Sequence, residues 1–94
     1  MPLEIIISIT ALQDIQQGLF YYQQQQDGLG TKFEDRVNHT FTKIQQAPFN
    51  ASFAYDYVRY KVVDKYPYII LYEFDEEAIY ILRIFNTYLS PKRI

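Results

Sequence analysis

The stretch from Tyr57 to Pro91 constrains the fold most, because it reads as three consecutive β-strands separated by tight turns. β-Branched and aromatic residues dominate all three segments, which run over Tyr57–Val63, Tyr68–Phe74 and Ile79–Phe85. Turns as short as those between them join antiparallel strands. Apolar residues at both odd and even positions of the last two segments indicate central strands that are covered on both faces. The stretch therefore predicts an antiparallel meander.

A first amphipathic helix is predicted from Ala11, with Thr10 as its N-cap. Apolar side chains recur there at steps of three and four residues, as they do along one face of a helix. The helix should end at the glycine-containing cluster Asp27–Gly30. The residues expected to face the core are Leu12, Ile15, Leu19 and Tyr22.

A second helix is predicted to begin after Thr31, since Glu34 stands three residues further on, at the spacing of a capping box. Pro48 should close it, because a proline disfavours helical backbone at the residue before it. A loop this short makes the two helices an antiparallel hairpin. Its core-facing residues are expected to be Phe33, Val37, Phe41 and Ile44.

Two further segments complete the predicted architecture. Leu3–Ile9 is apolar nearly throughout and suggests a strand buried on both faces, whereas Asn50–Asp56 reads as an irregular aromatic connector. At 94 residues the chain can build one small core, so a single domain over residues 1–94 is expected. We therefore predict an α+β fold of order β-α-α-β-β-β, with a helical hairpin packed on a four-stranded, mainly antiparallel sheet.

The amino-acid composition limits which kinds of binding site and which cellular location we expect. The absence of cysteine excludes disulfides and thiolate metal sites, and His39 is the only histidine, so no metal or cofactor is expected. The net charge of −2 argues against a grip on nucleic acid phosphates, although it permits a local basic face. No apolar run reaches the roughly 20 residues of a spanning helix, and Glu4 stands where a signal peptide carries basic residues. We expect a cytoplasmic protein.

Basic side chains gather in the last third of the chain. The period of two places Arg59 and Lys61 side by side on one face of their strand, which we expect to be exposed. Arg83 interrupts an apolar run, so it must be paired or must face an open surface. One interpretation is a basic, tyrosine-lined surface for an acidic partner or a phosphate backbone; the other is a set of solvated strand ends with Arg83 in a salt bridge. The candidate binding residues are Arg59, Lys61, Lys65, Arg83, Tyr88, Lys92 and Arg93.

Several segments together resemble the RelE/ParE superfamily of bacterial toxins from toxin–antitoxin pairs. The first helix reads ALQDIQQGLFYYQQQ, the second opens with GLGTKFEDRV and closes with IQQAPF, and the strands read VRYKVVDKYPYIILYEF and AIYILRIFNTYLSPKR. This pattern is most similar to the ParE-like branch, often labelled plasmid stabilisation proteins. The resemblance covers nearly the whole chain and implies the β-α-α-β-β-β fold.

The resemblance also bears on activity. RelE-type ribonucleases use basic and tyrosine side chains to position and protonate mRNA on the ribosome, but Ile69, Asn86 and Leu89 stand where these relatives carry Arg, His and Arg. The ParE-like branch instead implies a toxin that binds its target, usually DNA gyrase, and that a cognate antitoxin neutralises. Two alternatives stay open: an mRNA endonuclease using Arg59, Lys61, Arg83 and Tyr88, and an inactive relative kept as a protein-binding module. A homodimer and a toxin–antitoxin hetero-oligomer are both compatible with the sequence.

Overall fold

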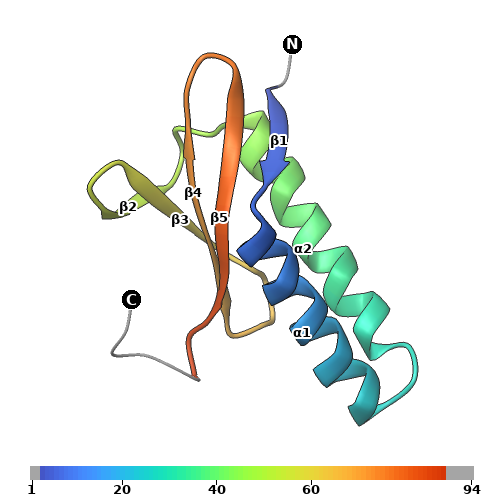
Figure 1. Cartoon of the computed structure of the whole chain (residues 1–94). Helices are drawn as coiled ribbons and strands as arrows, with labels where there is room; N and C mark the ends of the chain where they lie inside the picture. The colour runs from blue at the N-terminus through green and yellow to red at the C-terminus, as the bar shows by residue number, and fades with distance from the viewer. Residues whose placement is uncertain (1–2, 89–94) are drawn as a thin grey trace.

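The computed structural model describes residues 3–88, which form two helices and five strands (Figure 1). In chain order these elements are β1 (Glu4–Ile7), α1 (Ile9–Gln25), α2 (Leu29–Gln46), β2 (Ser52–Tyr55), β3 (Val58–Val62), β4 (Tyr68–Phe74) and β5 (Ala78–Asn86). The strands make one sheet in the order β1-β5-β4-β3-β2, in which β1 is parallel to β5 and every other pair is antiparallel. The predicted helical hairpin, the meander and the α+β class are confirmed.

The sheet has five strands rather than the predicted four. Residues Ser52–Tyr55, expected to lie in an irregular connector, pair with β3 as the edge strand β2. Tyr55 pairs with Val58, which leaves Asp56 and Tyr57 as a two-residue turn, and Asp56 takes a left-handed backbone with φ 46°. Aspartate tolerates that conformation better than most residues. In the sequence, the one sign of this hairpin is therefore Asp56, which stands between two segments rich in aromatic residues.

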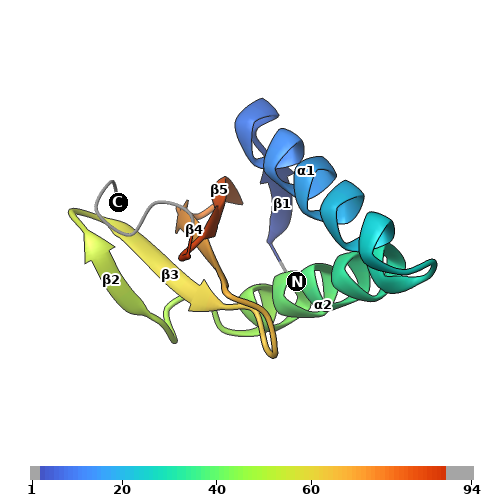
Figure 2. The same ribbon diagram turned by 90° about the horizontal axis from the view of Figure 1, so that it is seen from below.

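Both helices lie on the same side of the sheet, while β2 and β3 project away from them (Figure 2). On α2 the predicted core face is confirmed, because Phe33, Val37, Phe41 and Ile44 are all buried. On α1 the buried residues are Ala11, Ile15 and Gly18, whereas Leu12 is 47% exposed. The prediction is correct for Ile15, which is buried, and for Tyr22, which packs against the core, but it is wrong for Leu12. Ala11 and Gly18 complete the core face, because small residues allow this helix to approach its neighbours closely. The sheet contributes Tyr68, Ile70, Tyr72, Ile79, Ile81 and Ile84 to the same core.

Both predicted N-caps are wrong. The N-cap of α1 is Ser8, whose Oγ accepts a hydrogen bond from the backbone N–H of Ala11 at 3.0 Å. The N-cap of α2 is Gly28, with φ 92°, in a left-handed conformation that suits glycine. The side-chain oxygen of Gln23 accepts hydrogen bonds from the N–H groups of Gly28 and Gly30. A glutamine of α1 therefore satisfies the first donors of α2 in place of the predicted capping box.

Strand β1 is not buried on both faces as predicted. It lies at the edge of the sheet and pairs with β5 alone among the described residues. Ile6 is 45% exposed and Ile7 is 38% exposed. Its run of isoleucines therefore reflects strand propensity more than burial.

A close approach joins α1 to an aromatic cluster made of Tyr22, Phe33, Tyr66 and Tyr68. The ring centroid of Phe33 is 4.9 Å from that of Tyr68 and 5.2 Å from that of Tyr22. A Cβ at Gly18 would lie only 2.6 Å from two ring carbons of Phe33, whose side chain is fully buried. Glycine at this position lets the ring pack directly against the helix backbone.

Gly18→Ala is therefore expected to destabilise the protein, even though alanine is the better helix former. Moving a buried ring costs about 1–3 kcal/mol, which outweighs the gain of about 1 kcal/mol in helix propensity. Urea unfolding followed by circular dichroism measures the change. Gln24→Ala, at an exposed position of the same helix, is the control and should leave the midpoint unchanged or raise it. An unchanged midpoint for Gly18→Ala would contradict the packing described here.

Candidate functional site

Strand β5 contains a β-bulge at Leu82. Tyr72 of β4 pairs with Ile81, but the neighbouring Leu71 pairs with Arg83, so Leu82 is an extra residue without a partner in β4. Bulges of this kind bend a strand and redirect its side chains. This bulge lies where β5 passes α1, and it determines how Arg83 meets that helix.

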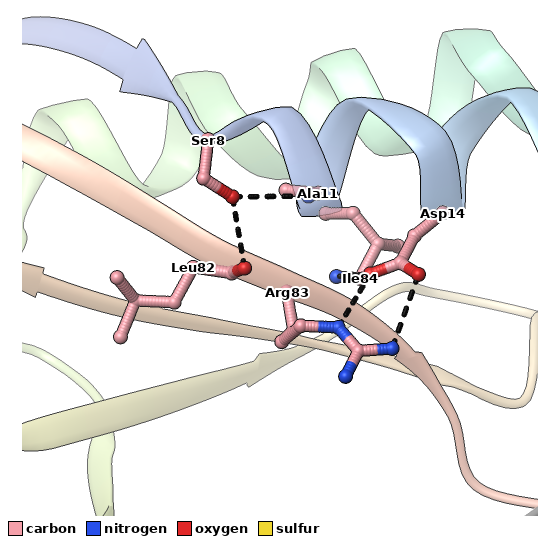
Figure 3. Close-up of polar contacts among 6 residues, drawn as sticks. All are labelled: Ser8, Ala11, Asp14, Leu82, Arg83 and Ile84. Atoms are coloured by element: carbon pink, nitrogen blue, oxygen red, sulfur yellow. Dashed lines mark hydrogen bonds and ion pairs between the residues drawn. The ribbon is translucent and has the colours of Figure 1, made fainter.

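Helix α1 replaces β1 as the neighbour of β5 beyond Ile7. The backbone N–H of Ser8 donates to the carbonyl of Ile81 at 3.0 Å, and the Ser8 Oγ donates to the carbonyl of Leu82 at 3.0 Å. The N–H of Ile84 donates to Asp14 Oδ2 at 3.0 Å (Figure 3). Two polar side chains of the first helical turns therefore satisfy backbone groups that a longer β1 would otherwise pair.

The same Asp14 carboxylate binds Arg83 through two hydrogen bonds (Figure 3). Arg83 Nε donates to Asp14 Oδ2 at 2.8 Å, and Arg83 Nη2 donates to Asp14 Oδ1 at 3.1 Å. Hydrogen bonding to this carboxylate raises the pKa of Arg83. The side chain of Asp14 is 11% exposed and that of Arg83 is 44% exposed, so one edge of the guanidinium is anchored while the rest reaches solvent. Bidentate pairs of this type are among the stronger and more directional polar contacts in proteins.

A groove of about 540 Å³ opens beside this ion pair, between α1 and the end of β5. Its volume falls within the range of pockets that take a small ligand or one or two side chains of a partner. Four tyrosines contribute to the walls, together with the Asp14–Arg83 pair. The lining residues are Asp14, Gln17, Tyr21, Tyr22, Pro67, Tyr68, Arg83, Ile84, Phe85, Asn86 and Tyr88.

The phenols of the groove are hydrogen-bonding groups rather than bases at neutral pH. Burial raises the pKa of Tyr22 to about 12, with the neighbouring Tyr68 adding to the effect, and burial also raises the pKa of Tyr68. Both rings therefore stay protonated, and their hydroxyl groups can donate or accept. The groove offers aromatic surface, phenolic hydroxyls and the solvent-facing edge of one guanidinium.

The groove continues onto the face of the sheet that the helices leave uncovered. The strand register places Tyr60, Leu71 and Arg83 in one row of that face, and Val62, Ile69 and Phe85 in the next. Leu71 is 4% exposed and Phe85 is 9% exposed, whereas Val62 is 59% exposed. A largely apolar sheet face thus meets the groove at Arg83.

The structure separates the predicted basic residues. In the register, Arg59 pairs with Tyr72 and Lys61 pairs with Ile70, so both point to the helix side of the sheet, opposite to Arg83. Arg59 donates to the carbonyls of Phe49 and Ala51, and its guanidinium lies 4.0 Å from the ring centroid of Phe53.

Lys61 donates to the carbonyl of Asn50 at 3.4 Å. Together, Arg59 and Lys61 fasten the connector between α2 and β2, and they do not share an exposed face with Arg83.

The other candidates are distributed as follows. Tyr88 is 80% exposed and lines the groove beside Arg83. Lys65 takes a left-handed turn conformation, with φ 71°, and borders a separate hollow with residues of α2 such as Arg36 and His39. Lys92, Arg93 and the aligned Leu89 lie outside the described residues. Arg83 and Tyr88 are the candidates that the groove brings together.

Asp14 is the site residue that the sequence interpretation missed. A signal for it exists: Asp14 is the one acidic residue in the pattern of α1, and Arg83 is the one cation within an apolar strand. The two are 69 residues apart, and nothing local connects them. Pairing them requires knowing that α1 runs along β5.

Comparison with known proteins supports the fold. No family model matches the chain, and no curated protein matches it. Among solved structures, it is similar to a chain from "Chromosomal ParDE TA system from P. aeruginosa" at 16% sequence identity, with a TM-score of 0.79 over 89% of this chain and 95% of that one. The fold implied by the resemblance to the RelE/ParE superfamily is therefore confirmed.

Neither helix in residues 3–88 is apolar enough over a sufficient length to cross a bilayer. The same residues contain no group of three His, Cys, Asp or Glu side chains that could hold a metal ion.

Asp14→Ala is expected to lower the free energy of unfolding by about 2 kcal/mol, because it removes two charge-assisted bonds and leaves the Ile84 N–H without its acceptor. Urea denaturation checks the value. The control is Asp64→Ala, which breaks the longer, more exposed Arg36–Asp64 contact of 3.8 Å. Surface pairs of that kind contribute little, so the control should change stability by less than about 0.5 kcal/mol. Equal losses in the two variants would contradict the role assigned to Asp14.

The raised pKa of Tyr22 predicts that the folded protein loses stability at alkaline pH. This pKa is about 12 in the folded protein and 10.0 ordinarily, so as the pH rises the unfolded chain loses this proton first. The contribution of Tyr22 is fully present below pH 10 and disappears between about pH 10 and about pH 12. Tyr22→Phe should flatten the decline of unfolding free energy over this window, measured by urea titrations at several pH values. Tyr57→Phe, at a side chain that is 84% exposed, is the control, and an identical slope in wild type and Tyr22→Phe would refute the assignment.

Proposed function

We propose that this chain is the toxin component of a bacterial type II toxin–antitoxin system of the ParE-like kind. The observation that carries the proposal is the similarity to a chain of a ParDE system, which extends over 89% of this chain and 95% of that one. It agrees with the resemblance of the sequence to the ParE-like branch. In this proposal the toxin acts in the cytoplasm by binding a target such as DNA gyrase, and a cognate antitoxin neutralises it.

The chemistry of the groove supports binding over RNA cleavage. Cleavage of a phosphodiester needs a group that transfers protons near neutral pH and positive charge on the developing phosphorane. Asp14 is occupied by Arg83 and Ile84, and its negative charge offsets that of the guanidinium. The raised pKa of Tyr22 makes this phenol a poor proton-transfer group. Ile69 and Asn86 supply no replacement for the Arg and His of RelE-type relatives.

The uncovered sheet face and the groove form the binding surface in this proposal. A segment of the antitoxin would lie along Val62, which is exposed, and Ile69, which is partly exposed, and would place a side chain in the groove. Exposed apolar patches commonly mark interaction sites, and a segment that folds on binding can cover a large surface. Arg83 and Tyr88 would contact the partner directly, whereas Arg59 and Lys61 would act by holding the connector before β2.

The remaining candidate residues take secondary roles in the proposal. Lys65 lies on a different side, at the hollow bordered by α2, and would contact a larger target rather than the antitoxin segment. Lys92 and Arg93 would present positive charge to the larger target as well. These assignments separate a central contact at Tyr88 from peripheral charges that affect association rate more than affinity.

The test is expression of the chain in bacteria, alone and together with the protein encoded by the adjoining open reading frame. We expect growth arrest that the neighbouring protein relieves, inhibition of DNA supercoiling by purified gyrase, and intact mRNA in a purified translation mixture. Cleaved mRNA with normal supercoiling would favour the endonuclease alternative. Normal growth when the chain is expressed alone would favour the inactive binding module.

Variants at Tyr88 distinguish binding from catalysis. Tyr88→Ala should weaken growth arrest and antitoxin affinity at least about tenfold, since aromatic anchors in interfaces contribute about 2 kcal/mol or more. Tyr88→Phe retains the ring and should retain toxicity, whereas a phenol used in catalysis would be lost in this variant. Tyr57→Ala removes an equally exposed tyrosine at the β2–β3 turn and should have no effect. If the Tyr88→Phe substitution were enough to abolish toxicity, that result would contradict the binding mechanism.

A further inference from the structure

The basic residues of α2 all lie in one row along the helix. Successive members are separated by four, three and four residues, a spacing that places side chains on the same side of a helix. We call them the α2 basic row: Lys32, Arg36, His39 and Lys43. The acidic residues of the helix, Glu34 and Asp35, stand outside the row. Helix α2 therefore sorts its charges by sign.

This sorting does not favour the helix itself. Lys32 and Arg36 are four residues apart and carry like charges, which destabilise a helix at this spacing. A helix that is merely solvated gains stability when acidic and basic residues alternate at the same spacing. Glu34 has no basic residue three or four positions away on either side. The row thus concentrates positive charge at some cost to the helix.

The turn between β3 and β4 brings a further cation to the row. Lys65 and three residues of the row border one hollow of about 590 Å³. The lining residues are Lys32, Asp35, Arg36, His39, Lys65 and Tyr66. Lys65 holds a left-handed backbone with φ 71°, a conformation that glycine adopts more easily. A lysine kept in a strained turn position supports a functional role for its ammonium group.

Most of these cations have no acidic partner within residues 3–88. Arg36 Nη1 lies 3.8 Å from Asp64 Oδ2, and both side chains are largely exposed. The ammonium groups of Lys32, Lys43 and Lys65 make no hydrogen bond or ion pair in this part of the chain. Surface contacts as long as that of Arg36 neutralise little charge. The surface formed by the row and Lys65 is therefore positive.

The net charge of −2 is compatible with this surface because the acidic residues gather elsewhere. The turn after β4 contains Asp75, Glu76 and Glu77, whereas Lys65 lies in the turn before it. The strand between the two turns has 7 residues, which corresponds to a length of about 23 Å. A charge separation of this kind orients a molecule toward an anionic surface.

We propose that the α2 basic row and Lys65 bind the phosphate backbone of a nucleic-acid duplex without reading its sequence. The row covers about 16 Å of helix axis, at 1.5 Å for each residue. A duplex carries one negative charge for about every 1.7 Å of its axis, so a straight row of cations meets several phosphates. Lysine and arginine side chains are the usual donors to phosphate oxygens, and such contacts carry no sequence information.

Other anions fit this surface less well. Single strands bind where bases stack on exposed aromatic rings, but the one ring at the hollow, that of Tyr66, packs against Tyr22 and Phe33. A compact anion such as pyrophosphate would occupy the hollow and leave Lys43 unused, because Lys43 lies outside it. An acidic protein segment would also need apolar contacts at the centre of its interface, and the row contains no apolar side chain.

The duplex-binding surface lies apart from the groove of the proposed toxin function. The groove is lined by α1 and the end of β5, whereas the row belongs to α2. Duplex binding therefore requires neither the toxin activity nor the antitoxin. It adds a second kind of partner to the same domain.

Fluorescence anisotropy of a short labelled DNA duplex, titrated with the full chain at several salt concentrations, tests the proposal. We expect saturable binding with a micromolar dissociation constant at low salt, equal for two unrelated sequences. The logarithm of the association constant should fall against the logarithm of the salt concentration with a slope of about −3, since each neutralised phosphate contributes about −0.9. A duplex RNA probe shows which duplex binds more tightly, and tighter binding of either assigns the source of the phosphates.

The row variant, Lys32→Gln/Lys65→Gly, removes two cations. It should raise the dissociation constant by about tenfold or more and reduce the salt slope by about 2. Glycine accepts the positive φ at position 65, so the thermal midpoint should not fall. Asp64→Asn should instead tighten binding, because it removes the carboxylate beside Arg36.

Two controls match these variants in net charge. Lys92→Gln/Arg93→Gln removes two cations from the C-terminal segment and should weaken binding less than the row variant does. Glu76→Gln removes one negative charge, as Asp64→Asn does, but at the exposed turn after β4. It should leave the dissociation constant unchanged. Thermal melts check that every variant folds.

Four results would overturn the proposal. The first is the absence of duplex binding at low salt, and the second is binding that the row variant does not weaken. The third is equal tightening by Glu76→Gln and Asp64→Asn, which would reflect net charge alone. The fourth is tighter binding of a single strand, of pyrophosphate or of a polyglutamate peptide than of the duplex. Growth arrest is a separate readout, so failure here is distinguishable from failure of the toxin hypothesis.

Discussion

The contact between Asp14 and the bulged part of β5 is the interaction on which the groove and its surroundings depend. One carboxylate accepts three hydrogen bonds, two from Arg83 and one from the backbone of Ile84. It closes the strand edge that β1 leaves open, holds α1 along β5, and orients the guanidinium at the entrance of the groove. Without it, the backbone N–H of Ile84 would lose its acceptor, and the hydrogen bonds of Ser8 to Ile81 and Leu82 would remain as polar contacts between the start of α1 and β5.

This attachment divides the molecule into surfaces with different chemistry. The groove beside Arg83 is aromatic and rich in hydroxyl groups, and it merges with an apolar sheet face that no helix covers. The outer side of α2 is charged, whereas the outer side of α1 is neutral and partly apolar.

The accuracy of the sequence predictions followed the range of the interactions involved. Strand β4 was predicted residue for residue, and the core face of α2 was correct, because alternation and the helical repeat are local properties. The face of α1 was only partly correct, because Ala11 and Gly18 pack against the core beside Ile15, whereas Leu12 does not. Strand β2 was missed because an edge strand of four exposed residues has little hydrophobic pattern to reveal it. Arg59 and Lys61 were correctly placed on one face, but which face that was depended on the sheet.

The sequence by itself determined the order of the elements apart from β2, the meander and the resemblance to ParE-like proteins, since each of these rests on residues close together in the chain. Only the tertiary structure decided that Arg83 pairs with Asp14, that Arg59 and Lys61 support a connector, and that the tyrosines of α1 and β4 share a groove. The reason is physical. A salt bridge or a pocket wall depends on which elements pack side by side, and residues 69 positions apart carry no local signal of their contact.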